Sequence, residues 1–213
     1  MPKRKRLHRF ISLSADTQQP NKVSVNDTLW HTIPDFSFTT QTGKSFTSED
    51  AKDKVLIVSF FTAQDEERIV QINEYFRMFQ EEFDDDKEVL LLAHTVTPLI
   101  DTLARLQKLV QQYKIESDKW FLLTGTKDDI YQQISEGYHL PIPKLTDSTR
   151  LETLVYPKQV VLVGRKGIIR GYYRLETLQD VKALMSDIRW LQLEYPTKHK
   201  REIEWKLKKN DEQ

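Results

Sequence analysis

Val55–Phe79, VLIVSFFTAQDEERIVQINEYFRMF, carries the clearest structural signal in the sequence. Its first residues form a nearly continuous apolar and β-branched run, which is typical of a strand covered on both faces in a parallel sheet. From Ile69 onward, apolar residues recur three or four positions apart, which predicts an amphipathic helix packed on that strand. A polar turn, residues 62–68, joins the two. The pattern therefore predicts a strand–turn–helix unit of an α/β protein.

The same reasoning predicts the elements around this unit. They are an N-terminal hairpin (31–47), a second buried strand (89–96), a second amphipathic helix with Leu99 on its apolar side (98–115), a short strand (120–125), a third helix capped by Thr126 (126–140), a second hairpin (158–173) and a long last helix (177–195). This order predicts a thioredoxin-like fold, with a mixed central sheet flanked by helices. Pro157 directly precedes the second hairpin, where such folds commonly place a proline facing the active-site turn, so we interpret it as structural and leave a cis bond open.

Composition limits the chemistry. With 213 residues, 30% charged and 38% apolar, the chain predicts one soluble domain of ordinary size, residues 30–196, between two arms. The 32 basic residues balance the 32 acidic ones, which argues against a dedicated nucleic-acid-binding protein. The chain contains no cysteine, and this excludes disulfides, thiolate nucleophiles, peroxiredoxin-like activity and thiol redox pairs.

The two arms are charged. Residues 1–29 begin with PKRKRLHR, and such a basic arm is usually solvated, with contact to a membrane surface or a partner as the alternative. Residues 197–213 form a charged tail in which apolar residues alternate around Trp205, which suits an extended segment laid along a partner. A loose, solvated tail is the alternative, and interleaved glutamates argue against nucleic acid. No apolar run is long enough to cross a bilayer, and residues 1–13 lack the apolar core of a secretory signal.

Several segments together resemble a known family. IPDFSFTTQTGKSFT, VLIVSFFT, HTVTP, WFLLTGTKDDIY, GIIRGYY and DIRWLQLEYP occur in the order, and near the spacing, of the Sco/SenC family. The resemblance runs from about residue 33 to residue 196. It implies a thioredoxin-like fold, copper binding, and a role in cytochrome c oxidase assembly at the outer face of a bacterial inner membrane or in the mitochondrial intermembrane space.

The resemblance fails at the family's metal ligands. The family holds copper with a Cys-x-x-x-Cys pair after the first core strand and a histidine before the hairpin, and these positions fall here on Gln64, Arg68 and Tyr156. An amide is a weak neutral ligand, a guanidinium repels a metal, and a phenol is un-ionised near neutral pH. The family's aspartate before proline is also replaced, by Thr97. We therefore expect a member that has lost the copper site and uses no cofactor.

Two interpretations fit the carboxylates of the turn, Asp65, Glu66 and Glu67. At the start of a helix they stabilise the N-terminus through the helix dipole, which makes the turn structural. A carboxylate acid–base pair with one raised pKa is the alternative, although no nucleophile lies near in sequence. Metal binding through other ligands stays open, although no two of the five histidines have metal-ligand spacing and none has a local carboxylate in an HxxE or HxH arrangement.

The sequence thus predicts a non-enzymatic binding or scaffold protein, tied by resemblance to a respiratory or other membrane-associated complex. The alternative is a metal chaperone that uses ligands other than the family's. We expect a protein partner and no nucleic acid, with membrane contact through the family's setting or the basic arm, at the periplasmic face. The candidate partner-binding residues are Gln64, Asp65, Glu66, Arg68, Tyr156, Pro157 and Trp205.

Overall fold

A computed structural model describes residues 31–115, 118–145 and 154–194. Both predicted arms, with Trp205, lie outside the described residues. The elements are β1 (Ser37–Thr40), β2 (Ser45–Thr47), β3 (Val55–Phe61), α1 (Glu66–Glu82), β4 (Val89–Thr95), α2 (Leu103–Tyr113), β5 (Trp120–Thr124), α3 (Lys127–Gln132), the π-helix η1 (Gln133–Gly137), β6 (Lys144–Leu145), β7 (Leu154–Val155), β8 (Val160–Val163), β9 (Ile169–Tyr173) and α4 (Leu178–Glu194).

A seven-stranded mixed sheet forms the middle of the domain. Its strand order is β2-β1-β5-β4-β3-β8-β9. Strands β3, β4 and β5 are parallel neighbours, whereas β1–β2, β1–β5, β3–β8 and β8–β9 pair antiparallel. The predicted crossover through α1 and both predicted hairpins are present, and β6 and β7 form a separate small pair that we did not predict.

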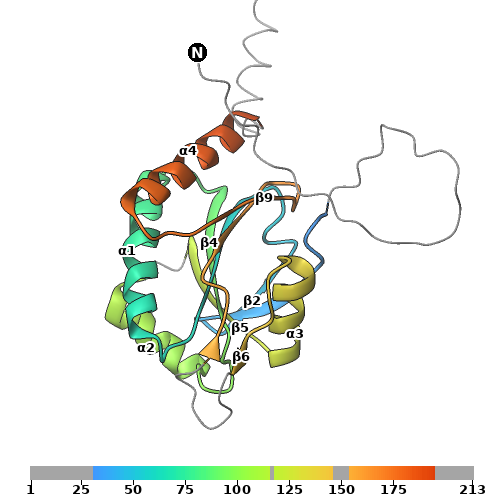
Figure 1. The fold of residues 1–213 in the computed structure, drawn as a ribbon, viewed down its shortest axis with the longest axis vertical. Coiled ribbons are helices and arrows are strands. Elements are labelled where there is room, and N and C mark those ends of the chain that lie inside the picture. Colours follow the sequence, from blue (N-terminus) through green and yellow to red (C-terminus); the bar gives the residue numbers. More distant parts are fainter. Residues whose placement is uncertain (1–30, 116–117, 146–153, 195–213) are drawn as a thin grey trace, which may run out of the picture.

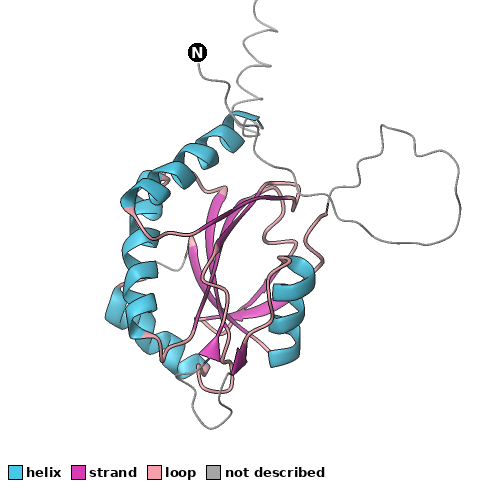
Figure 2. Ribbon diagram, in the orientation of Figure 1, coloured by secondary structure: helices cyan, strands magenta, loops and turns pink. Residues whose placement is uncertain are grey.

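Each face of the sheet carries its own core because side chains alternate along a strand. On one face, Val55, Ile57 and Phe61 of β3 pack with α1, α2 and α4. On the other face, Leu56 and Phe60 pack with α3, β1 and β2. Figures 1 and 2 show this layering, with α1, α2 and α4 on one side of the sheet and α3 on the other. All seven residues of β3 are buried, as the apolar run predicts.

Two turns depend on glycine. Gly43 in the β1–β2 turn has φ +80°, and Gly167 in the β8–β9 turn has φ +70°. A Cβ at Gly167 would lie 2.8 Å from the Thr32 side chain, so this turn excludes a larger residue both by its backbone and by its neighbour.

The second helix starts later than predicted. Leu99 lies in a turn and is 86% exposed, and α2 begins only at Leu103. The turn is held by backbone hydrogen bonds from the amides of Ile100 and Asp101 to Thr97 O, so the apolar Leu99 does not continue the helical stripe. The third helix is capped by Thr126, as predicted, but its last turn widens into the π-helix η1. The described residues contain no cis peptide bond, so the Tyr156–Pro157 bond is trans.

Candidate functional site

The polar turn between β3 and α1 is built as a helix cap. Asp65 is the N-cap, and its carboxylate accepts a hydrogen bond from the Arg68 backbone N–H at 3.0 Å. Glu66 and Glu67 occupy the first turn of α1, where the helix dipole favours anions by about 0.3–1 kcal/mol each. The carboxylates that follow the buried strand therefore have the structural role that the sequence predicts.

A second carboxylate, Asp101, holds the turn through buried hydrogen bonds. It is fully buried and accepts hydrogen bonds from Ala63 N–H (3.1 Å) and from the hydroxyls of Thr95 and Thr97 (2.5 and 2.9 Å). Arg105 supports the same turn by donating to the Ala63 carbonyl at 2.9 Å. Sequence reasoning missed Asp101 because its partners come from separate segments; its place near the end of a buried strand was the only signal.

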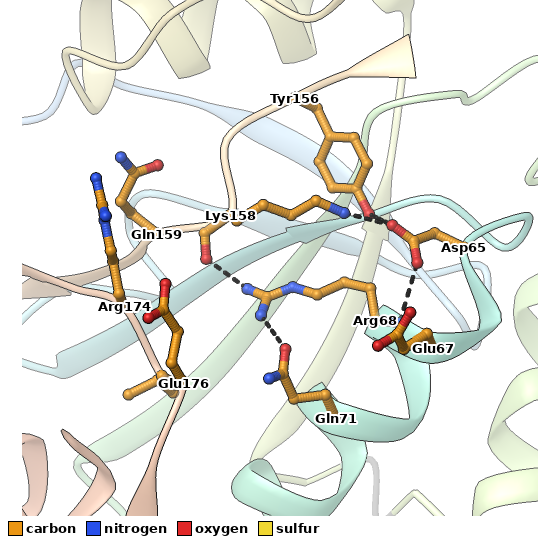
Figure 3. A pocket seen from close by; sticks show the side chains of 10 residues that line it. Asp65, Glu67, Arg68, Gln71, Tyr156, Lys158, Gln159, Arg174 and Glu176 are labelled. Carbon is orange, nitrogen blue, oxygen red and sulfur yellow. Dashed lines mark hydrogen bonds and ion pairs between the residues drawn. The ribbon is translucent and has the colours of Figure 1, made fainter. Parts of the chain in front are cut away.

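The segment before β8 closes over the turn. Tyr156 donates its hydroxyl to Asp65 Oδ2 at 2.6 Å, and Lys158 forms an ion pair with the same oxygen atom. The Lys158 ammonium also lies 3.8 Å from the centroid of the Tyr156 ring, within the range of a cation–π interaction. Figure 3 shows the three side chains meeting above the start of α1. Two segments that are far apart in the sequence are thus joined by one carboxylate and one ammonium group.

Arg68 forms the inner wall of the site. Only 6% of the residue is exposed, and its guanidinium donates to Lys158 O at 2.6 Å and to Gln71 Oε1 at 2.7 Å. These bonds hold the guanidinium, a permanent positive charge, against the Lys158 carbonyl and the Gln71 amide, as Figure 3 shows. A bound metal cation would have to share this space with the guanidinium and with Lys158.

The electrostatics fix the protonation states of the site. Burial alone would raise the pKa of Asp65, but hydrogen bonds from Lys158, Tyr156 and the Arg68 amide lower that pKa below its ordinary value. Burial, followed by the hydrogen bond to Asp65 and its negative charge, raises the pKa of Tyr156 well above its ordinary value. Asp65 is therefore ionised and Tyr156 is a neutral hydrogen-bond donor at neutral pH.

An open pocket of about 540 Å³ lies beside this network. It is lined by Asp65, Glu67, Arg68, Gln71, Tyr156, Lys158, Gln159, Arg174, Leu175 and Glu176. Asp65 and Lys158 form an ion pair, and the Arg68 guanidinium donates to neutral groups. The side chains of Glu67, Arg174 and Glu176, which also line the pocket, make no hydrogen bond or ion pair with another described residue. The pocket thus presents exposed charges of both signs.

The structure brings together most of the predicted partner-binding residues. Asp65, Arg68 and Tyr156 line the pocket. Gln64 and Glu66 are exposed and Pro157 is buried, and these three residues are sequence neighbours of lining residues without lining the pocket themselves. Lys158 and Arg174 also line the pocket, and sequence reasoning missed both. These placements concern position only, and the role of the residues in partner binding stays a prediction.

The buried histidine of β4 has a structural environment. His94 is 1% exposed, lies between aromatic rings and has a 3.2 Å hydrogen bond to the Tyr138 hydroxyl. Burial lowers its pKa to about 3, so the ring is neutral. The described part of the chain holds no group of three or more His, Cys, Asp or Glu side chains that could bind a metal ion. The spacing of the histidines in the sequence gave no sign that His31 and His139 lie in contact, as they do in the structure.

The domain is similar to solved Sco structures. A SCO1/SenC family lipoprotein from Bacillus anthracis has 20% identity and a TM-score of 0.64, over 75% of this chain and 94% of that one. BsSco, a member of the Sco family of cytochrome c oxidase assembly proteins, has 20% identity and a TM-score of 0.63, over 76% and 93%. Yeast Sco1 with copper bound has 15% identity and a TM-score of 0.62, over 80% and 93%. The predicted thioredoxin-like fold is therefore confirmed.

The SCO1/SenC family model matches residues 26–192. The chain belongs to the SCO1/SenC family. A comparison with curated proteins gave no match. Within this SCO1/SenC chain, the three positions that the resemblance assigns to copper ligands hold an exposed amide, a buried guanidinium and a buried phenol, at Gln64, Arg68 and Tyr156. These residues do not fit a copper ion, because none supplies the thiolate or imidazole donors that copper prefers.

Proposed function

We propose that this protein is a non-catalytic SCO1/SenC member that acts by binding another protein. The observation that carries the proposal is the bonding of the residues that stand at the family's ligand positions. Tyr156 donates to Asp65, and Arg68 donates to the Lys158 carbonyl, so these two side chains are engaged within the protein and are not available as metal donors. Because the chain has no cysteine, it has no thiol group that could carry out thiol redox chemistry.

The pocket supplies the binding surface. It is open to solvent and has a volume of about 540 Å³. Glu67, Arg174 and Glu176 carry charges in its lining that a partner's side chains can pair with. Charges of this kind at an interface contribute chiefly to specificity and association rate. The predicted contacts Gln64 and Glu66 extend this surface along the start of α1, and Trp205 is the proposed contact in the tail.

The setting follows from the family. BsSco belongs to the Sco family of cytochrome c oxidase assembly proteins, and the Bacillus anthracis relative is a lipoprotein. We therefore place this protein at the periplasmic face of a membrane, in assembly of a respiratory or other membrane-associated complex. Among the helices that the structure describes, none combines the length and apolar character needed to cross a bilayer.

Site-specific photocrosslinking in the native host tests this proposal. A photoreactive side chain replaces the exposed Gln64 beside the pocket or, as the matched control, the exposed Asp85 beyond the opposite end of α1. We expect one discrete crosslinked protein from position 64, reduced by Arg174→Glu and unaffected by a copper chelator. The same crosslinks from both positions, or a crosslink that requires copper, would contradict the proposal.

A metal chaperone with other ligands is the second candidate function. The contact between His31 and His139 is the observation that favours it.

A further inference from the structure

Two histidines that are far apart in the sequence lie in contact at the edge of the domain. The ring centroids of His31 and His139 are 3.8 Å apart and the ring planes are tilted by 42°. His31 precedes β1, and His139 follows the π-helix η1. π-Helical turns are rare and frequently occur at functional sites. The pair lies outside the pocket at the start of α1, because neither residue lines that pocket.

A carbonyl group orients the ring of His31. His31 Nε2 lies 2.9 Å from the backbone oxygen of Gly137. A carbonyl oxygen only accepts hydrogen bonds, so Nε2 carries the proton and Nδ1 of the neutral ring keeps its lone pair. Metal-binding histidines almost always donate their other ring N–H to a carbonyl, a carboxylate or water in this way. His31 therefore has the orientation and tautomer of a metal ligand.

His139 is held in an unusual backbone conformation. Its φ is +52°, in the left-handed region that few residues other than glycine adopt. The residue is exposed, and its side chain makes no hydrogen bond to another described residue. Left-handed residues persist when the surrounding structure imposes them, and they cluster at functional sites. The exposed ring is free to turn about its side-chain bonds while it stays beside His31.

We propose that His31 and His139 form a two-imidazole site for a divalent cation that prefers nitrogen ligands, Zn(II) or Cu(II). Two imidazole nitrogens on one tetrahedral Zn(II) ion lie about 3.3 Å apart, given Zn–N distances of about 2.0–2.1 Å. The centroids of two imidazoles on one such ion lie about 5 Å apart. The exposed His139 ring therefore has to turn away from its present 3.8 Å contact before both rings reach a common ion. Imidazole suits both metals, and no thiol is needed. The two other positions on the ion stay open to water or to ligands from a partner. This inference does not depend on the proposed protein-binding function.

Titration of the full-length protein with Zn(II), and separately with Cu(II), tests the site by calorimetry at pH 7.5. The test variants are His31→Gln, which keeps a donor for Gly137 O, and His139→Asn, since asparagine tolerates a left-handed backbone. The matched control is the double variant His8→Ala/His199→Ala, which removes two histidines and leaves the pair intact. We expect one ion per chain, at least tenfold weaker binding in either test variant, and unchanged binding in the control.

A spectroscopic measurement separates loss of ligands from loss of folding. The electron paramagnetic resonance spectrum of the Cu(II)-loaded protein should show coupling to two imidazole nitrogens, reduced to one in either test variant. Absence of binding, or equal affinity in the wild type and in both test variants, would overturn the proposal.

Discussion

Tyr156 donates a hydrogen bond of 2.6 Å to Asp65, and this contact joins the segment before β8 to the N-cap of α1. The ammonium group of Lys158 binds the same carboxylate. The resemblance to the family assigns the positions of its metal ligands to these same two segments. The protein thus connects them with its own cation and a phenol. This arrangement needs neither a metal nor a redox state to hold the surface in place.

Removing the phenol tests that connection. Tyr156→Phe should lower the free energy of unfolding by about 1.5–3 kcal/mol, since the lost hydrogen bond has a charged acceptor. Urea denaturation measures the change. Tyr113→Phe is the matched control, because Tyr113 makes no side-chain hydrogen bond to another described residue and its loss should change stability little. Equal effects of the two substitutions would contradict the role assigned to Tyr156.

Removing the ammonium group of Lys158 should raise the pKa of Asp65. The folded-state pKa of Asp65 is lowered, so its contribution to stability is present above the unfolded pKa of about 3.9 and is lost as the pH falls through the folded pKa. In Lys158→Met, the pKa of Asp65 should rise, as measured by NMR titration. Lys52→Met, which removes the exposed ion pair with Glu49, is the control and should leave that pKa unchanged.

Asp101 should be the most sensitive carboxylate of the domain. Asp101→Ala removes the shared acceptor of the Ala63 amide and of two threonine hydroxyls, and each buried polar group left unpaired costs about 1–3 kcal/mol. We expect a loss of stability of about 3 kcal/mol or more and faster hydrogen exchange at the Ala63 amide. Asp129→Ala, an exposed partner of Thr126 in the α3 cap, is the control with an expected loss of about 1 kcal/mol. Similar losses in the two variants would show that Asp101 does not organise the turn.

His94 should make the protein sensitive to mild acid. Its folded-state pKa is about 3, below the unfolded value of about 6.5, so only the unfolded chain takes up this proton as the pH falls from 6.5 toward 3. Stability should therefore fall by up to about 1.4 kcal/mol per pH unit from this group in that range. His94→Phe keeps a ring among Phe38 and Phe60 and should flatten the pH profile. An unchanged slope between pH 6 and 4 would mean that His94 is not the group responsible.

The fold was largely predictable because its signals are local and periodic. The apolar run of β3, the helical stripe from Ile69 to Phe79 and the two glycine turns each specify an element without reference to the rest of the chain. Leu99 shows where this reasoning stops. Its apolar side chain suits a helix, but the backbone turn at Thr97 places it in solvent.

The site was predictable only in part because its contacts cross the chain. The turn at Gln64–Arg68 and the segment at Tyr156 were recognised by resemblance, yet their bridge through Lys158 depends on the packing of β8 against β3. The meeting of His31 with His139 depends on the hydrogen bond to Gly137 O and on the left-handed backbone at position 139. No spacing rule detects such long-range pairs.

Gln64, Arg68 and Tyr156 do not supply the thiolate and imidazole donors of a copper site. The most direct test is the Cu(I) affinity of the wild type, measured anaerobically beside Tyr156→Phe and the triple variant Gln64→Cys/Arg68→Cys/Tyr156→His. Since thiolates favour Cu(I), the account predicts that the triple variant binds at least a hundredfold more tightly than the wild type, and that Tyr156→Phe does not alter the wild-type value. Wild-type binding as tight as that of the triple variant, and weakened by Tyr156→Phe, would contradict it.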